Sequence, residues 1–210
     1  ARLPDCYQPN DRTRLIDPWQ PTRQECGLPD EGMVFASFNK MYKISAPLFD
    51  VWMRVLRAIP GSVLWLWESN HIAATNLRHE AEARGVAGSR LYFAPFMLGP
   101  QHLARYRVVD LVLDTFPCTS HTTGSDALWV GCPMVTCAGE TFASRVAGSL
   151  LNNVGLPELV TDSLETYENL ILALAKDPER LATIRRQLAP PLPVKGGQTT
   201  AAVGDPSPAG

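Results

Sequence analysis

Short apolar runs alternate with amphipathic segments along most of this chain, from Gly32 to about Ala189. Such runs are short enough to be buried strands, and the segments between them have helical spacing. Strands that alternate with helices predict an α/β fold, a parallel sheet covered by helices on both faces. We expect strands at Met33–Phe38, Val63–Trp67, Leu91–Phe93, Leu111–Leu113, Met134–Thr136 and Glu158–Val160.

Local signals place the helices between these strands. Ser45 is suited to cap a helix that tolerates Pro47 in its first turn and runs to about Ile59. The remaining helices are expected at about 73–85, 100–105, 124–130, 143–154, 164–175 and 178–188. Right-handed crossovers then bring the loops that follow the strands to one edge of the sheet.

The two ends of the chain differ from this regular region. Residues 1–31 are polar and rich in proline, so we expect an extended connector there, and one domain over residues 32–189. Residues 190–210 mix proline, glycine, threonine and alanine, and cannot bury enough apolar surface to offset their ordering entropy. We expect that tail to be disordered.

Composition excludes several classes of protein. The 210 residues carry a net charge of −2 and no basic block, which argues against nucleic-acid binding. No apolar run is long enough to span a bilayer, and the first residues lack the core of a signal peptide. The five cysteines include no C-x-x-C pair, so we expect reduced thiols, no zinc site and a cytoplasmic protein.

The transition from the strand at Leu111–Leu113 to the following helix carries the most informative polar groups. His121, Thr122 and Thr123 lie where the helix begins. Backbone amides and the helix dipole favour a phosphate at such a place, which is also where open α/β sheets bind ligands. Thr123 with Asp126 also matches a capping box, and spacing alone favours that interpretation.

Two other loops at this edge contain candidate ligand-binding side chains. Lys43 follows the first strand and could neutralise a phosphate, although a solvated lysine is the simpler interpretation. His102 and Arg105 lie three positions apart, on one face of a short helix, as a surface pair or as a contact to a base. The dinucleotide, P-loop and G-x-S-x-G fingerprints are all absent from the sequence.

These loops, taken in order, resemble the protein O-linked N-acetylglucosamine transferases. The match is to the C-terminal half of their catalytic region, in a form like the bacterial members, from about Leu3 to about Leu188. The motifs that carry it are FNKMYKI at residues 38–44, VLWL at 63–66, LDT at 113–115, HTTGSDALW at 121–129, GCPMVT at 131–136 and GETFASRVA at 139–147.

The resemblance implies a Rossmann-like domain, the nucleotide-sugar half of a two-domain glycosyltransferase B fold. The donor would be UDP-N-acetylglucosamine, and the sugar would pass with inversion to a Ser or Thr hydroxyl of a protein, without a metal or other cofactor. Lys43 matches a lysine on the β-phosphate that steadies the leaving UDP. His121, Thr122 and Thr123 match the diphosphate site.

Further roles follow from the same resemblance. Asp126 matches an acid that binds the ribose, His102 and Arg105 match uridine contacts, and the backbone near Met97 would face the uracil. Two positions depart from the animal members: Lys40 replaces a glutamine near the β-phosphate, and Gly99 replaces a lysine beside the nucleotide. Positive charge is therefore redistributed around the expected diphosphate.

The resemblance also implies partners that these residues do not include. They are the N-terminal catalytic half, with its candidate acid/base histidine, and the helical repeats that recruit protein substrates. The aromatic closing segment of the family is replaced here by the Pro/Gly tail. Two alternatives stay open: a protein O-fucosyltransferase that uses GDP-fucose, and a nucleotide-binding remnant without activity alone.

Overall fold

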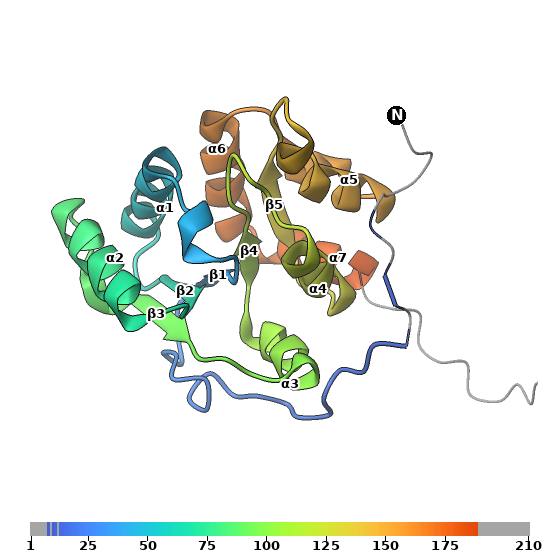
Figure 1. The fold of residues 1–210 in the computed structure, drawn as a ribbon, viewed down its shortest axis with the longest axis horizontal. Coiled ribbons are helices and arrows are strands. Elements are labelled where there is room, and N and C mark those ends of the chain that lie inside the picture. Colours follow the sequence, from blue (N-terminus) through green and yellow to red (C-terminus); the bar gives the residue numbers. More distant parts are fainter. Residues whose placement is uncertain (1–7, 9, 12, 189–210) are drawn as a thin grey trace, which may run out of the picture.

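A computed structural model describes residues 8, 10, 11 and 13–188 of the chain. The tail expected to be disordered, residues 190–210, lies outside the described residues, as does part of the expected connector. The described part folds around a single sheet with helices packed on it (Figure 1).

The sheet has six strands, and every neighbouring pair is parallel. Its spatial order is β3-β2-β1-β4-β5-β6, so the chain first builds outward from β1 in one direction and then returns to build in the other. This order is that of a Rossmann-like sheet, with the reversal between β1 and β4. The strands are β1 (Val34–Ser37), β2 (Val63–Trp67), β3 (Leu91–Ala94), β4 (Leu111–Leu113), β5 (Met134–Cys137) and β6 (Val160–Thr161).

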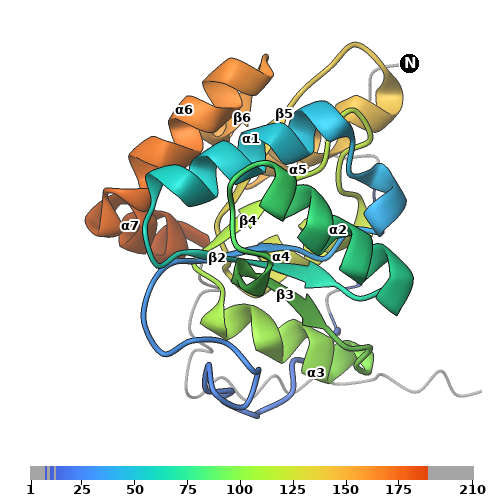
Figure 2. The same ribbon diagram turned by 90° about the vertical axis from the view of Figure 1, so that its left-hand side faces the viewer.

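Helices cover both faces of the sheet, as the alternation predicts. Figure 2 shows α1 and α6 on one side of the sheet and α3 on the other. The helices are α1 (Ala46–Ala58), α2 (His71–Ala83), α3 (Gly99–Ala104), α4 (Thr122–Trp129), α5 (Val146–Asn153), α6 (Leu164–Ala175) and α7 (Pro178–Leu188). Short 3-10 turns lie at Met41–Lys43, Gly88–Arg90, Arg105–Val108, Phe142–Ser144 and Pro157–Leu159.

The core lies between the sheet and these helices. All residues of β1, β4 and β5 are buried, which is the pattern of a parallel sheet covered on both faces. From α1, Leu48, Trp52 and Val55 pack into this core and are fully buried. The apolar side of α1 therefore faces the sheet.

Three local predictions were wrong in detail. Ser45 lies at the start of α1, but its hydroxyl donates to the Phe116 carbonyl (2.9 Å) and caps nothing. Thr123 lies inside α4, not at its cap, because its hydroxyl bonds Asn39 instead. The strand expected at Glu158–Val160 is mostly a 3-10 turn, and only Val160–Thr161 pairs with β5.

The described part of residues 10–31 crosses the surface of this domain, passing beneath α3 in Figure 1. Asp17 donates its backbone N–H to the Pro100 carbonyl (3.1 Å), and Arg107 donates to the Asp17 carbonyl (2.8 Å). The segment is therefore held on α3 and on the turn that follows it. Its role as a connector to another domain stays a prediction.

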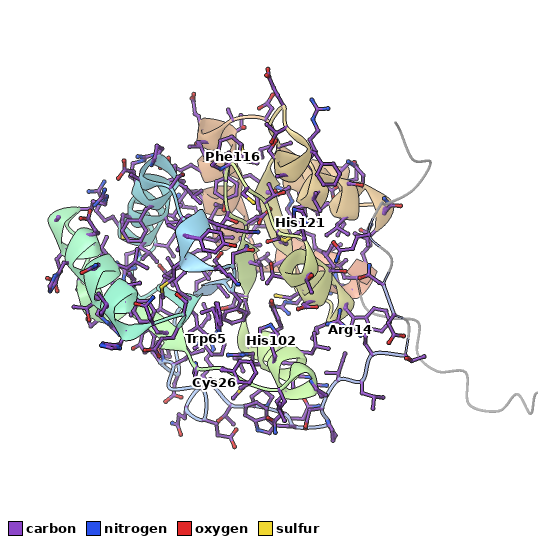
Figure 3. All side chains as sticks on the ribbon, in the orientation of Figure 1. Arg14, Cys26, Trp65, His102, Phe116 and His121 are labelled. Carbon is purple, nitrogen blue, oxygen red and sulfur yellow. The ribbon has the colours of Figure 1, made fainter. Side chains whose placement is uncertain are left out.

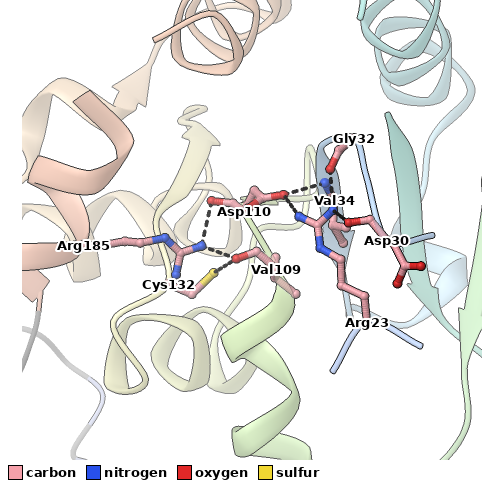
Figure 4. Close-up of polar contacts among 8 residues, drawn as sticks. All are labelled: Arg23, Asp30, Gly32, Val34, Val109, Asp110, Cys132 and Arg185. Carbon is pink, nitrogen blue, oxygen red and sulfur yellow. Dashed lines mark hydrogen bonds and ion pairs between the residues drawn. The ribbon is translucent and has the colours of Figure 1, made fainter. Parts of the chain in front are cut away.

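A second anchor holds the same segment at the amino-terminal edge of the sheet (Figure 4). Arg23 forms an ion pair with Asp110 (2.9 Å) and donates to the Gly32 carbonyl (2.6 Å). The same Asp110 oxygen accepts the N–H of Val34 at the start of β1 (2.8 Å). Arg185 of α7 donates to the Asp110 carbonyl (3.2 Å), so these contacts join the segment, β1 and the last described helix.

Across residues 8, 10, 11 and 13–188, no helix combines the length and apolar character needed to cross a membrane. Cys26, Cys118, Cys132 and Cys137, the cysteines in that part of the chain, are free thiols.

Candidate functional site

A cavity of about 540 Å³ opens at the carboxyl ends of the strands, beside the reversal between β1 and β4. Its volume falls in the range of roughly 300–1,000 Å³ that is typical of small-molecule sites. The chain leaves β1 and β4 toward opposite faces of the sheet, which opens a crevice between the two loops. The cavity is lined by Phe38, Asn39, Lys40, Tyr42, Lys43, Trp67, Phe96, Met97, Leu98, Gly99, His102, Arg105, His121, Thr122 and Thr123.

The structure brings together all the side chains predicted for the site except that of Asp126. The loop after β1 supplies Lys40 and Lys43, the loop and helix after β3 supply Met97, His102 and Arg105, and the start of α4 supplies His121, Thr122 and Thr123. The described residues that line the cavity include two lysines and an arginine but no aspartate or glutamate. The cavity therefore suits an anionic ligand.

Lys43 lies at the end of the 3-10 turn Met41–Lys43 and is half-buried. Its ammonium donates to the Thr119 carbonyl (3.0 Å) and, more weakly, to the side-chain oxygen of Asn39 (3.5 Å). These contacts bring the lysine from the first loop against the segment that leads into α4. A cation held in this way is ready to meet a charged ligand at the amino end of that helix.

The amino end of α4 forms the opposite wall of the cavity. The first hydrogen bond of the helix runs from the N–H of Ser125 to the His121 carbonyl (3.0 Å). The backbone N–H groups of Thr122, Thr123 and Gly124 come before it and make no intrahelical hydrogen bond. Such amides and the helix dipole attract anions. The ring of His121 lies edge-on to Phe142, with centroids 6.3 Å apart, and burial together with Lys43 lowers the pKa of its imidazole.

Asp114, at the end of β4, orders the loop that ends at His121. Its carboxylate is completely buried and accepts hydrogen bonds from the N–H of Thr115 (2.8 Å), from the N–H and hydroxyl of Ser120 (2.7 and 2.5 Å) and from the hydroxyl of Thr136 (2.6 Å). Burial raises the pKa of Asp114, and these donors oppose that rise. The loop is thus tied at both ends to one buried group.

His102 and Arg105 line the other end of the cavity. The ring of His102 packs edge-on against Phe38 and Tyr106, with centroid distances of 5.5 and 5.4 Å. Burial, Arg105 and Arg14 lower the pKa of His102 to about 4, so the imidazole is neutral near pH 7. A neutral imidazole offers one donor and one acceptor to a ligand.

Arg105 is more deeply buried than a surface pair would allow, with only 1% of its surface exposed. Its guanidinium donates to the Pro95 carbonyl (2.9 Å) and lies over the Phe38 ring, 5.1 Å from the centroid. Its buried Nε has no hydrogen-bond partner, and burial lowers its pKa. A buried, incompletely satisfied cation at a cavity is a common mark of a functional site.

Asp126 does not line the cavity. Its carboxylate is buried against Arg14 of the N-terminal segment, in an ion pair, and lies 3.9 Å from His102 Nε2. Figure 3 labels Arg14, on the N-terminal segment, and His102, on α3. Burial raises the pKa of Asp126, whereas Arg14 opposes this. Asp126 thus stands behind His102, on the side away from the open cavity.

The sequence reasoning assigned no role to Asn39, Arg14 or Asp114. Asn39 lies two residues after β1 and lines the cavity, so its place near the carboxyl end of a strand was the available signal. Arg14 lies in a segment without periodicity, and no local pattern indicated its contact. For metals, the described residues contain no group of three or more His, Cys, Asp or Glu side chains placed to hold an ion.

The model of glycosyl transferase family 41 matches residues 16–190 of this chain. The chain belongs to this family. The match covers the whole sheet, its helices and every residue that lines the cavity.

Curated relatives agree with membership of glycosyl transferase family 41. The chain is 36% identical over 194 residues to the probable UDP-N-acetylglucosamine–peptide N-acetylglucosaminyltransferase SEC of Arabidopsis thaliana, across 90% of this chain and 20% of the relative. It is 38% identical over 167 residues to the UDP-N-acetylglucosamine–peptide N-acetylglucosaminyltransferase of Caenorhabditis elegans, across 80% of this chain and 14% of the relative. This family 41 chain therefore spans a fifth or less of these relatives.

Solved structures support the same fold. The O-GlcNAc transferase mutant K341M of Thermobaculum terrenum superposes with a TM-score of 0.72 at 37% identity, over 75% of this chain and 31% of that one. A sucrose-phosphate synthase of Thermosynechococcus elongatus superposes with a TM-score of 0.60 at 17% identity, over 82% and 43%. The second likeness concerns the fold alone and agrees with a Rossmann-like α/β domain.

Proposed function

We propose that this chain supplies the donor site for UDP-N-acetylglucosamine in the transfer of N-acetylglucosamine to Ser or Thr hydroxyls of proteins. The observation that carries the proposal is that Lys43 and the amino end of α4 line one cavity, at the reversal between β1 and β4. The printed names of the SEC and Caenorhabditis relatives support the choice of donor and acceptor.

The proposed ligand lies along the cavity with its diphosphate at α4. Lys40, Lys43, His121 and the amides of Thr122 and Thr123 surround the phosphates, because cations and free amides gather at that end. The uridine lies at the other end, against Met97, His102 and Arg105. Asp126 supports the ribose end from behind His102, since its carboxylate does not line the cavity.

The chemistry follows from the charge that develops during transfer. The bond between the sugar and the β-phosphate breaks while the acceptor hydroxyl attacks the opposite face of the sugar and gives its proton to a base of the N-terminal catalytic half, so negative charge grows on the UDP oxygens. Lys43 and the amides of α4 stabilise that charge most strongly when it is greatest, which lowers the barrier. In this proposal the side chains and the amino end of α4 supply the stabilisation, and a metal has no role.

The acceptor is assigned to other parts of the protein. By the resemblance, an N-terminal catalytic half and helical repeats bind the protein substrate. The free thiols of Cys26, Cys118, Cys132 and Cys137 fit a reducing compartment, and we place the reaction in the cytoplasm. GDP-fucose is not favoured as donor, since the relatives are named for UDP-N-acetylglucosamine.

Calorimetric titration of this chain with UDP tests the proposal. We expect UDP to bind more tightly than GDP, and Lys43→Ala to weaken UDP binding by about ten- to a hundred-fold, the range for a hydrogen bond to a charged group. Lys176→Ala, which removes an exposed lysine at the end of α6, is the matched control. Equal affinity of the Lys43→Ala variant and the parent chain would contradict the role of Lys43.

Transfer itself is tested separately. Incubation of the chain with labelled UDP-N-acetylglucosamine and a Ser-containing peptide distinguishes a competent enzyme from a chain that binds the nucleotide but transfers nothing alone. UDP binding without transfer would support the second alternative, the nucleotide-binding remnant. Failure of the parent chain to bind UDP would reject the donor site.

A further inference from the structure

We infer that Asn39 is a positioning residue. It orders the proposed diphosphate site before a ligand binds, because it fixes both the ammonium of Lys43 and the hydroxyl of Thr123. The inference rests on the proposed donor site and adds a residue to which nothing above gave a role in binding. Asn39 lies two residues after β1 and is 5% exposed, and its amide contacts Lys43 on one wall of the cavity and Thr123 on the other.

The donor and acceptor of each hydrogen bond in this network follow from the buried carboxylate of Asp114. Two backbone N–H groups, which only donate, point at its Oδ1 atom. The Ser120 hydroxyl lies 2.5 Å from the same oxygen and donates its one proton to it. The Ser120 oxygen is then left to accept a hydrogen bond.

That acceptor determines how the Asn39 amide is turned. The Asn39 Nδ2 lies 2.7 Å from the Ser120 hydroxyl and donates to it, and it donates more weakly to Asp114 Oδ1 at 3.5 Å. The other end of the amide gives the same answer independently, because Lys43 has no acceptor and lies 3.5 Å from Asn39 Oδ1. The carbonyl oxygen of Asn39 therefore faces Lys43 and Thr123.

Two consequences reach the cavity. Thr123 donates its hydroxyl proton to Asn39 Oδ1 (2.8 Å). A bound phosphate would therefore accept a hydrogen bond from the backbone N–H of Thr123 and not from its hydroxyl. Lys43 directs two of its three N–H bonds at Thr119 and Asn39, which leaves the third for a ligand oxygen. The lysine is therefore ordered before a ligand arrives, and loss of this order weakens binding by about ten-fold.

A matched pair of variants isolates this chain of hydrogen bonds. Ser120→Ala and Thr136→Val each remove one hydroxyl that donates to the Asp114 carboxylate, and neither residue lines the cavity. Of these two hydroxyls, only that of Ser120 also accepts a hydrogen bond from Asn39. We expect the Ser120→Ala variant to lose about five- to ten-fold in UDP affinity, and the Thr136→Val variant to stay within two-fold of the parent.

A measurement without ligand separates this inference from the donor site itself. Brief acetylation with acetic anhydride, followed by peptide mass spectrometry, gives the labelling of Lys43 relative to exposed Lys40 on the same loop. Freeing the Lys43 ammonium raises this ratio. We expect it to rise in the Ser120→Ala and Asn39→Ala variants and to stay at the parent value in the Thr136→Val variant.

The outcomes are distinct. If the parent chain binds no UDP, the proposed function fails, while the labelling ratio still decides the role of Asn39. If the parent binds UDP but the Ser120→Ala and Thr136→Val variants agree in affinity and labelling, the positioning role is overturned. Thermal melts establish that each variant is folded. If Ser120→Ala does not fold, Asn39→Ala takes its place in the comparison with Thr136→Val.

Discussion

Arg14 and Asp126 lie 112 positions apart in the sequence and form an ion pair on the side of α4. The Asp126 side chain is 8% exposed, whereas that of Arg14 is 26% exposed. The N-terminal segment thus supplies the counter-charge of a buried carboxylate that also stands behind His102. The pair links the segment to the cavity without either residue lining it.

Removal of Arg14 should destabilise the domain. Arg14→Ala leaves the Asp126 carboxylate buried without its partner, which costs several kcal/mol for a fully buried pair and about 1–3 kcal/mol here, given the partial exposure of Arg14. Urea denaturation measures the change, with Arg186→Ala on the exposed face of α7 as the control. If the same loss persists in an Asp126→Asn background, the ion pair is not its source.

Stability should fall as the pH is lowered from about 6.5 toward 4. The folded pKa of His102 is about 4, below its ordinary 6.5, because burial, Arg105 and Arg14 disfavour the imidazolium. In that window the unfolded chain binds a proton that the folded chain does not, so up to about 3 kcal/mol is lost. The raised pKa of Asp126 acts in the opposite direction and reduces the net slope.

A His102→Gln variant isolates this contribution. Thermal or urea unfolding across the same pH range should show a slope smaller by up to one proton than that of the parent. His79→Gln, which removes an exposed imidazole from α2, controls for loss of a histidine. NMR titration of the His102 ring gives a direct check, and a midpoint above 6 would contradict the structure.

A lysine at position 99 should strengthen nucleotide binding. A Cβ atom added to Gly99 would meet nothing within 4 Å, so the longer side chain fits at the rim of the cavity. One added exposed charge should tighten UDP binding by about two- to five-fold, and less at high salt. Gly99→Gln adds length without charge, and an equal gain for this variant would exclude an electrostatic cause.

The hydroxyl of Tyr167 should matter for stability more than for binding. It donates to the backbone carbonyl of Asp114 (2.9 Å) and accepts from the indole N–H of Trp52 (3.3 Å), and all three residues are buried. Tyr167→Phe leaves two buried groups unpaired and should cost about 1–3 kcal/mol in urea denaturation. UDP affinity should stay within two-fold of the parent, because the Asp114 carboxylate keeps its donors; a ten-fold loss would show that α6 acts on the cavity.

The elements were predictable wherever a local signal was sufficient. Helices α6 and α7 match their predicted ranges, because a capping serine, Ser163, and a first-turn proline, Pro178, mark their starts. The parallel sheet was predictable from the alternation of apolar runs and helices. The strand order was not, because it depends on the direction of each crossover, which no local pattern specifies.

The site was predictable to a similar depth. The loops after β1, β3 and β4 meet because parallel strands present their carboxyl ends at one edge, and the cavity contains the predicted side chains of all three. The capping motif at Thr123 misled because its hydroxyl finds Asn39, which lies 84 positions away. Contacts over such separations, like that of Arg14, arise only when the chain has folded.

The reversal in the sheet has a consequence for how the molecule could be divided. Lys43 follows the first strand of the unit β1–β3, whereas His121 follows the first strand of the unit β4–β6, so each unit carries one wall of the proposed diphosphate site. A ligand that binds both units stabilises only the assembled form. If the chain were cut between the two units, UDP would favour reassociation of the two fragments. Its apparent affinity would then measure how readily the fragments reassociate.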